Sequence, residues 1–197
     1  MSEVAGTLNN LGNLVADQGL QSEALRYFEE ALSVYRRLVR DDPNSHLAGL
    51  SMTLHNLGAL LFDMNRIEEA QEDYEESLII SRQLAVANPE VYLGTVADTL
   101  DELANLHANQ GRNNEALKIF GEALATYRQL AVQNSEVYLP SVARVRWSIG
   151  RTYVAINQPA EARVAFQESL TIIRPFAARD PRQFGPLQDA AKSDLDT

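Results

Sequence analysis

The stretch TLHNLGALLFDMNRIEEAQEDYEESL, residues 53–78, decides the fold because the chain contains four versions of it. In each version two apolar helical patterns flank a short polar break. Equivalent residues recur every 46 positions without an insertion. A fixed period of about 20–50 residues is typical of solenoid proteins. The columns that show it best are Leu11, Leu57, Leu103 and Ile149; Gly12, Gly58, Ala104 and Gly150; Ala24, Ala70, Ala116 and Ala162; and Phe28, Tyr74, Phe120 and Phe166.

This spacing predicts two antiparallel helices in each repeat. The first helix is expected over roughly residues 2–17, where Val4, Leu8 and Leu11 form one apolar stripe. The turn column combines glycine and asparagine, the residues that most readily accept a positive φ. Its members are Gly19, Asn65, Gly111 and Asn157. We therefore expect one array of four helix pairs over about residues 1–42, 43–88, 89–134 and 135–180, with the aromatic column at 28, 74, 120 and 166 filling the space between successive repeats.

The prolines predict where helices begin and break. Asp42 before Pro43 is typical of a helix cap and first position. Pro140 would cost a continuous helix one hydrogen bond. We therefore expect a short turn at 43–46, 89–92 and 135–138, with the main helix starting at about 48, 94 and 140. His46, Tyr92, Tyr138 and Phe184 form a column in this linker that should pack between repeats. Residues 181–193 are expected to form a capping helix, and 194–197 a frayed tail.

Composition excludes several classes of function. The net charge of −10 argues against a nucleic-acid or anionic-membrane partner, because both favour a basic surface. There is no cysteine for a disulfide or thiolate metal site. The N-terminus does not resemble a secretory signal, and no apolar run approaches the roughly 20 residues needed to span a membrane. We therefore expect a cytoplasmic protein.

No catalytic motif is present in the sequence. The histidines His46, His55 and His107 lack short metal-ligand spacing, and there is no phosphate-binding glycine loop. Asp101 and Glu102 are adjacent, so they point in different directions on a helix. We expect no enzyme activity, no cofactor and no metal.

The repeated columns resemble the tetratricopeptide repeat family over about residues 3–180. The family pattern W-x2-L-G-x2-Y, then A, F and A, falls on Leu8, Leu11, Gly12, Val15, Ala24, Phe28 and Ala31, and at the same offsets in the other repeats. Two features depart from it. The period is 46 rather than about 34, and arginine replaces the closing proline, at Arg36, Arg82, Arg128 and Arg174. The long helices look closer to kinesin-light-chain-like and bacterial signalling-protein arrays.

The resemblance implies an all-α, right-handed superhelical solenoid of four antiparallel helix pairs plus a C-terminal capping helix. It also implies a scaffold or adaptor whose concave groove, lined by the first helices, binds a peptide or helix of a partner protein. The version that clamps a C-terminal carboxylate is not expected, because Asp101 stands where a basic residue is needed. Carried over by motif position, the groove residues are Asn9, Asn13, His55, Phe62, Asp101, Asn105, Arg144, Trp147 and Arg151.

Alternatives remain open for these residues and for the function. The asparagines either bond a partner's backbone or bridge neighbouring helices. Trp147 is either a binding hot spot with its arginines or a core residue that fills space beside Arg146. Glutamate at 30, 76, 122 and 168 and arginine at 36, 82, 128 and 174 suggest ion pairs between repeats or arginines at helix C-termini. Self-assembly into a homo-oligomer and a sensor portion of a larger signalling protein are the alternative functions.

Overall fold

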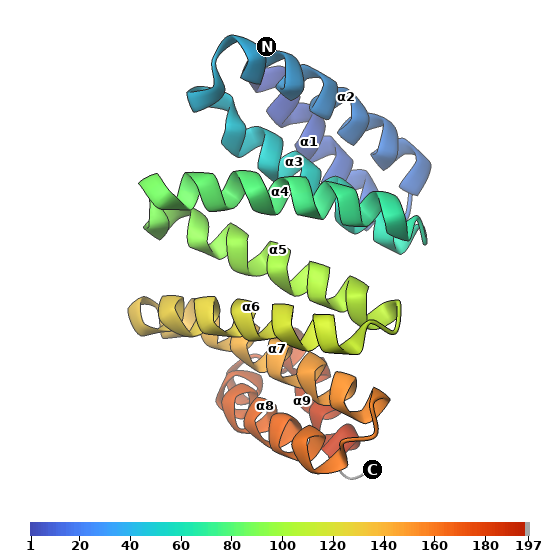
Figure 1. The fold of residues 1–197 in the computed structure, drawn as a ribbon, viewed down its shortest axis with the longest axis vertical. Coiled ribbons are helices and arrows are strands. Elements are labelled where there is room, and N and C mark those ends of the chain that lie inside the picture. Colours follow the sequence, from blue (N-terminus) through green and yellow to red (C-terminus); the bar gives the residue numbers. More distant parts are fainter. Residues whose placement is uncertain (196–197) are drawn as a thin grey trace. The chain divides into compact units, whose positions relative to one another are not determined.

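The computed structural model describes residues 1–195, which form helices joined by short turns and contain no strand. Figure 1 shows them in chain order from blue to red. The all-α prediction of four helix pairs and one further helix is therefore confirmed, while the right-handed superhelical course stays a prediction. The helices are α1 (Ser2–Asp17), α2 (Gln21–Asp41), α3 (Pro43–Asp63), α4 (Ile67–Ala87), α5 (Pro89–Asn109), α6 (Asn113–Gln133), α7 (Ser135–Ala155), α8 (Pro159–Arg179) and α9 (Pro181–Leu195).

The chain divides into two compact units, and each is described by itself. Unit 1 is Met1–Glu102, and unit 2 is Leu103–Thr197, described as far as residue 195. The boundary falls inside α5. Unit 1 therefore holds α1 to α4 with the first part of α5, and unit 2 holds the remainder of α5 with α6 to α9.

The turns within the helix pairs have the predicted backbone. Gly19, Asn65, Gly111 and Asn157 have φ values of 76°, 60°, 74° and 58°. The residue that follows each of these four donates its backbone N–H to a carbonyl of the preceding helix. Arg66 N, for example, lies 2.8 Å from Leu61 O. A left-handed residue followed by such a bond is a common helix C-terminal motif. The turn column therefore fixes the reversal of each pair.

Glycine sets the close approach of the two helices in a pair. A Cβ on Gly150 would lie 2.4 Å from the Phe166 ring, and one on Gly12 would lie 2.6 Å from Phe28. Contacts this short are repulsive, so the ring needs a glycine beneath it. The rings of Phe28 and Phe166 lie over the glycine of their own repeat, and the packing of this aromatic column between successive repeats stays a prediction.

The expected turns at the start of each repeat are absent. Helix α3 begins at Pro43, α5 at Pro89 and α7 at Ser135, and α7 runs on through Pro140. Proline at the sixth position of α7 removes only the bond to the Glu136 carbonyl, in the exposed first turn. The next residues, Val142 and Ala143, are buried, and their packing favours a continuous helix.

The capping helix is longer than predicted. Helix α9 runs from Pro181 to Leu195, so residues 194 and 195 are helical, and residues 196–197 of the expected frayed tail lie outside the described residues. Phe184 packs edge-to-face against Phe176 of α8, with ring centroids 5.6 Å apart. Together with Leu187 it covers the buried cluster of Ala143, Ile173 and Phe176. Helix α9 therefore shields the apolar end of unit 2.

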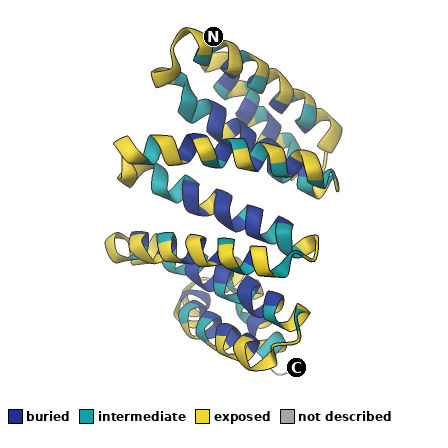
Figure 2. Cartoon of the chain, in the orientation of Figure 1, coloured by how far each residue is buried: buried dark blue, intermediate teal, exposed yellow. Residues whose placement is uncertain are grey.

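Buried residues, dark blue in Figure 2, alternate with exposed residues, yellow, along the helices. Within unit 1, Leu50 and Leu54 of α3 join Ala5, Tyr35 and Ile80 in one core cluster. In residues 1–195 no helix is both long and apolar enough to cross a membrane.

Candidate functional site: a pocket between α3, α4 and α5

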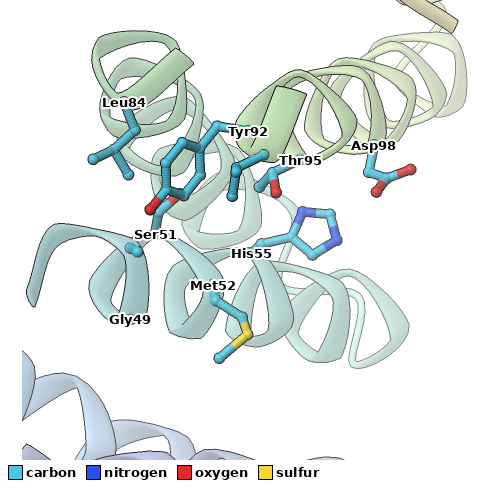
Figure 3. Close-up of a pocket in the computed structure, with 10 residues that line it drawn as sticks. Gly49, Ser51, Met52, His55, Leu84, Tyr92, Thr95 and Asp98 are labelled. Carbon is cyan, nitrogen blue, oxygen red and sulfur yellow. The ribbon is translucent and has the colours of Figure 1, made fainter. Parts of the chain in front are cut away.

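A pocket of about 400 Å³ opens in unit 1 where α3, α4 and α5 meet. Figure 3 shows the side chains that line it. Helix α4 contributes Leu84, and the two first helices of successive repeats provide the rest. From α3 come Gly49, Ser51, Met52 and His55, and from α5 come Tyr92, Thr95 and Asp98.

Helical spacing places these side chains on the walls. Met52 and His55 are three residues apart on α3, and Tyr92, Thr95 and Asp98 follow each other at the same interval on α5. Residues at this interval share one helix face. Gly49 leaves room for the ring of Tyr35, since a Cβ there would lie 2.3 Å from that ring.

His55 forms the polar edge of the pocket. Its Nδ1 lies 3.1 Å from Thr99 Oγ1, and its ring meets Tyr74 edge-on at 5.7 Å between centroids. The Thr99 hydroxyl donates its only proton to the Thr95 carbonyl, at 2.8 Å. His55 Nδ1 must therefore donate to Thr99, and Nε2 remains as an acceptor. Burial lowers the pKa of His55, and the Asp98 carboxylate opposes this only partly, so the ring is neutral at neutral pH.

A second pocket, of about 600 Å³, occupies the corresponding place in unit 2. Its wall residues Pro140, Ser141, Phe176, Gln183 and Phe184 lie 92 residues, two periods, after Ala48, Gly49, Leu84, Val91 and Tyr92 of the first. An ion pair of 2.8 Å between Arg179 and Glu136 lies at this pocket, and the Arg179 guanidinium stands 4.9 Å from the Phe176 ring. The repeat register thus builds the pocket, and its non-repeating residues set its chemistry.

Two predicted groove residues form bridges between first helices. Asn9 is only 1% exposed and accepts a hydrogen bond of 3.1 Å from Asn56 Nδ2, which joins α1 to α3. Trp147 Nε1 donates to Asp194 Oδ2 at 2.8 Å and joins α7 to α9. Each bridge links residues 47 apart, so the two occupy the same structural position. The interpretation of the asparagines as helix bridges is therefore confirmed for Asn9.

The other predicted groove residues differ in their exposure and contacts. Asp101 is fully buried, whereas Asn13 and Arg151 are exposed. The Arg151 guanidinium lies 5.0 Å from the Trp147 ring, and Arg144 donates to the Tyr127 hydroxyl at 3.5 Å. Phe62 and Asn105 are half-buried.

Of the predicted set, only His55 lines the unit 1 pocket. Sequence reasoning missed Met52, Tyr92 and Thr95. The available signal was helical spacing, because Met52 precedes His55 by one turn and Thr95 follows Tyr92 by one turn.

The repeated charges pair between repeats. Arg36 lies 2.8 Å from Glu76, and Arg128 lies 3.5 Å from Glu168, which also binds Arg146 at 2.7 Å. Both repeated pairs span 40 residues, which confirms the predicted ion pairs at these positions. Among residues 1–195, no cluster of histidine, aspartate or glutamate is arranged to hold a metal ion.

Sequence profiles of the tetratricopeptide repeat match residues 4–44, 50–88 and 95–174. The chain belongs to the tetratricopeptide repeat family. Tetratricopeptide repeats generally mediate protein–protein interactions. A sequence search of curated proteins found no match.

Several solved structures share this fold at low sequence identity. BtubC (BKLC) from P. vanneervenii is 18% identical, with a TM-score of 0.73 over 87% of this chain and 64% of that chain. Kinesin-light-chain TPR-like repeats from Podosopora anserina are 22% identical, with a TM-score of 0.71 over 99% of this chain and 85% of that one. The Rap conjugation gene regulator of plasmid pLS20, solved with the Phr* peptide, is 16% identical, with a TM-score of 0.65 over 89% and 43%. This chain therefore spans less than two thirds of BtubC and of the Rap regulator.

Proposed function

We propose that this chain is a non-enzymatic interaction module whose unit 1 pocket receives an apolar side chain of a partner polypeptide. The pocket itself is the observation that supports this role. Its volume of about 400 Å³ suits one large side chain, and Leu84 and Tyr92 supply apolar walls. Sites that bind ligands commonly combine such walls with a few polar groups, here His55 and Thr95.

Two further observations favour a polypeptide as the ligand. The pocket lies between first helices of successive repeats, the helices that the family resemblance assigns to partner binding. The Rap regulator, which shares the fold, was solved with a peptide. Met52 is 44% exposed at the mouth, and methionine adapts readily to different apolar partners.

The test is selection of peptides from a random display library on the full chain. Selected peptides should share an apolar anchor residue and should lose binding to a Met52→Trp variant, in which the indole fills the pocket mouth. Because Met52 is well exposed, this substitution should leave the fold intact, which circular dichroism would verify.

Arg144→Trp is the matched control, because Arg144 lies two periods after Met52. The selected peptides should bind this variant as they bind the wild type. Loss of binding to Arg144→Trp with retention by Met52→Trp would move the site to unit 2 and contradict the proposal. Failure to select any peptide that competes for the Met52 pocket would also contradict it.

A further inference from the structure

One side of helix α1 is largely apolar and open to solvent. This surface, called the α1 face below, consists of Val4, Thr7, Leu8, Leu11, Leu14 and Val15, which share one side of the helix. Val4 and Leu14 are each 55% exposed. At the equivalent positions of α3, 46 residues later, Leu50 and Leu60 are only 4% exposed, and the other four positions are buried as well. The same face is therefore covered on α3 and uncovered on α1.

Helix α2 covers this face on α3. Leu32, Tyr35 and Leu38 of α2 pack in one core cluster with Leu50 and Leu54 of α3. Helix α1 is the first helix of residues 1–195, so its own face lacks such a cover. The stacking of repeats within unit 1 thus shows which kind of element fits the α1 face, namely an amphipathic helix.

Glu30 indicates the charge that this helix should bring. Glutamates of its column pair with an arginine on the second helix of the preceding repeat. Glu76 lies 2.8 Å from Arg36, and Glu168 lies 3.5 Å from Arg128. Glu30 is the member of this column in the first repeat and is exposed, and within residues 1–195 its side chain has no such arginine. A helix on the α1 face would place its own arginine at Glu30 if it follows the register of α2.

The charge of the two units supports a cationic partner for unit 1. Residues 1–102 contain 18 acidic side chains against 6 arginines and no lysine, a formal charge of −12. Residues 103–197 contain 9 acidic and 11 basic side chains, a formal charge of +2. An acidic surface of this size raises the local concentration of cationic partners and speeds their association.

We propose that the α1 face binds an amphipathic helix of a partner protein, which packs apolar side chains on Val4, Leu11 and Leu14 and directs an arginine at Glu30. The partner helix takes the place on α1 that α2 holds on α3. This face shares no residue with the pocket between α3, α4 and α5, so the inference goes beyond the proposed function and does not depend on it.

Glu3 restricts the partner helix at one position. Its equivalent on α3 is Gly49, where a Cβ would lie 2.3 Å from the Tyr35 ring. Glu3 carries such a Cβ, so a tyrosine at this position of the partner helix would overlap with it. A serine leaves room, and Ser81 holds the same position in α4. The partner helix should therefore carry a small residue directly before its arginine.

A fluorescent peptide with the sequence of α2, residues 21–41, and the change Tyr35→Ser tests the proposal. A side-chain cross-link on its outer face holds it helical. Its binding to the full chain is measured by fluorescence anisotropy. The double variant Val4→Gln/Leu14→Gln should bind the peptide about tenfold more weakly than the wild-type chain, because two apolar contacts are lost. The peptide that retains Tyr35 should bind the wild type more weakly than the serine peptide.

Ile79→Gln/Val86→Gln is the matched control. Ile79 and Val86 are 68% and 87% exposed on α4 in the same unit and do not belong to the α1 face. This variant should bind the peptide as the wild type does, and circular dichroism verifies that both double variants fold. Equal weakening by the two would overturn the proposal, since any exposed apolar surface would then hold the peptide. Unchanged binding to Val4→Gln/Leu14→Gln would also overturn it.

The proposed ion pair has its own test. Glu30→Gln should weaken binding of the serine peptide about two- to fivefold, the range for one exposed ion pair, and should leave a peptide with the further change Arg36→Gln unaffected. Glu68→Gln removes one exposed charge of α4 in the same unit and should change neither affinity. Equal effects of Glu30→Gln and Glu68→Gln would overturn the pairing, because the charge of the unit alone would then explain them.

Sedimentation of the chain without peptide tests a second copy as the occupant. The chain should sediment as a monomer at every concentration used for binding. Self-association that Val4→Gln/Leu14→Gln suppresses and Ile79→Gln/Val86→Gln preserves would mean that another copy covers the α1 face, and it would overturn the proposal.

Discussion

At the residue scale, the glycines that receive aromatic rings control the helix spacing. Gly150→Ala should destabilise the chain by about 1–3 kcal/mol, the usual cost of overpacking, because its Cβ would lie 2.4 Å from the Phe166 ring. This cost should exceed the gain of about 0.5–1 kcal/mol that alanine brings to a helix interior. The midpoint of urea unfolding measures the difference.

Gly121→Ala separates the two effects. Gly121 also lies inside a helix, α6, but a Cβ there would have no heavy atom within 4 Å. This variant should therefore be stabilised by about 0.5–1 kcal/mol. Equal stability of Gly150→Ala and Gly121→Ala would mean that the packing of the Phe166 ring does not depend on Gly150.

Asp73 gives unit 1 a predictable response to pH. Burial is the largest cause that raises the pKa of its carboxyl, to about 6, and nearby glutamates add to it while Arg36 opposes it. Because the folded pKa lies above the unfolded value of 3.8, ionisation costs more in the folded state. The contribution of this group to stability is therefore complete below about pH 4 and is lost as the pH rises through about 6.

Asp73→Asn should accordingly raise the free energy of unfolding at pH 7.5 by about 1 kcal/mol, a value reduced for solvent screening. At about pH 4.5 the gain should be much smaller, because the wild-type carboxyl is then largely protonated in the folded state. Urea unfolding at both pH values measures this. Glu75→Gln, an exposed change on the same helix, should alter stability little at either pH, and a gain for Asp73→Asn that does not vary with pH would contradict the assignment.

At the element scale, the bridge between Trp147 and Asp194 should hold α9 against α7. Trp147→Phe keeps an aromatic ring but removes the donor of the 2.8 Å hydrogen bond, and should cost about 0.5–1.5 kcal/mol. Asp194→Ala should cost a similar amount, and the double variant should cost less than the sum, because both changes remove one bond. Hydrogen exchange of the α9 amides measures these stability costs. Strictly additive costs would show that the bridge contributes nothing.

The helices could be predicted well from the sequence because each turn and helix signal recurs in all four repeats. Gly19, Asn65, Gly111 and Asn157 are placed by their common need for positive φ. Pro140 shows where a local rule fails, since burial of the residues after it outweighs one lost hydrogen bond. The repeat could not reveal Asn9 as buried and Asn13 as exposed, because one helical turn separates them and the crossing of α1 with α3 decides their exposure.

The candidate site was predicted only at His55. Met52 stands on α3 with His55, whereas Tyr92 stands on α5. The pocket exists because Leu84 of a third helix, α4, completes the wall. A motif position identifies a helix face but not the distance between two faces. The tautomer of His55 likewise depends on the Thr99 hydroxyl, 44 residues away, so no local pattern could have indicated it.

At the scale of the whole molecule, the charge difference between units makes their stabilities respond differently to salt. Like charges at −12 repel one another within unit 1, and screening them should stabilise it, whereas unit 2 at +2 has little net repulsion to relieve. Stability in repeat arrays is local enough for such differences to persist within one chain.

Hydrogen exchange of individual amides at about 0.05 M and about 0.5 M sodium chloride would resolve this, because the Debye length falls from about 14 Å to about 4 Å over that range. Buried amides of α3 should exchange more slowly at the higher salt, and those of α8 should change little. Sodium sulfate at matched ionic strength controls for salt-specific effects. If α3 and α8 slowed equally, salt would act through general apolar burial, and the repulsion assigned to unit 1 would be wrong.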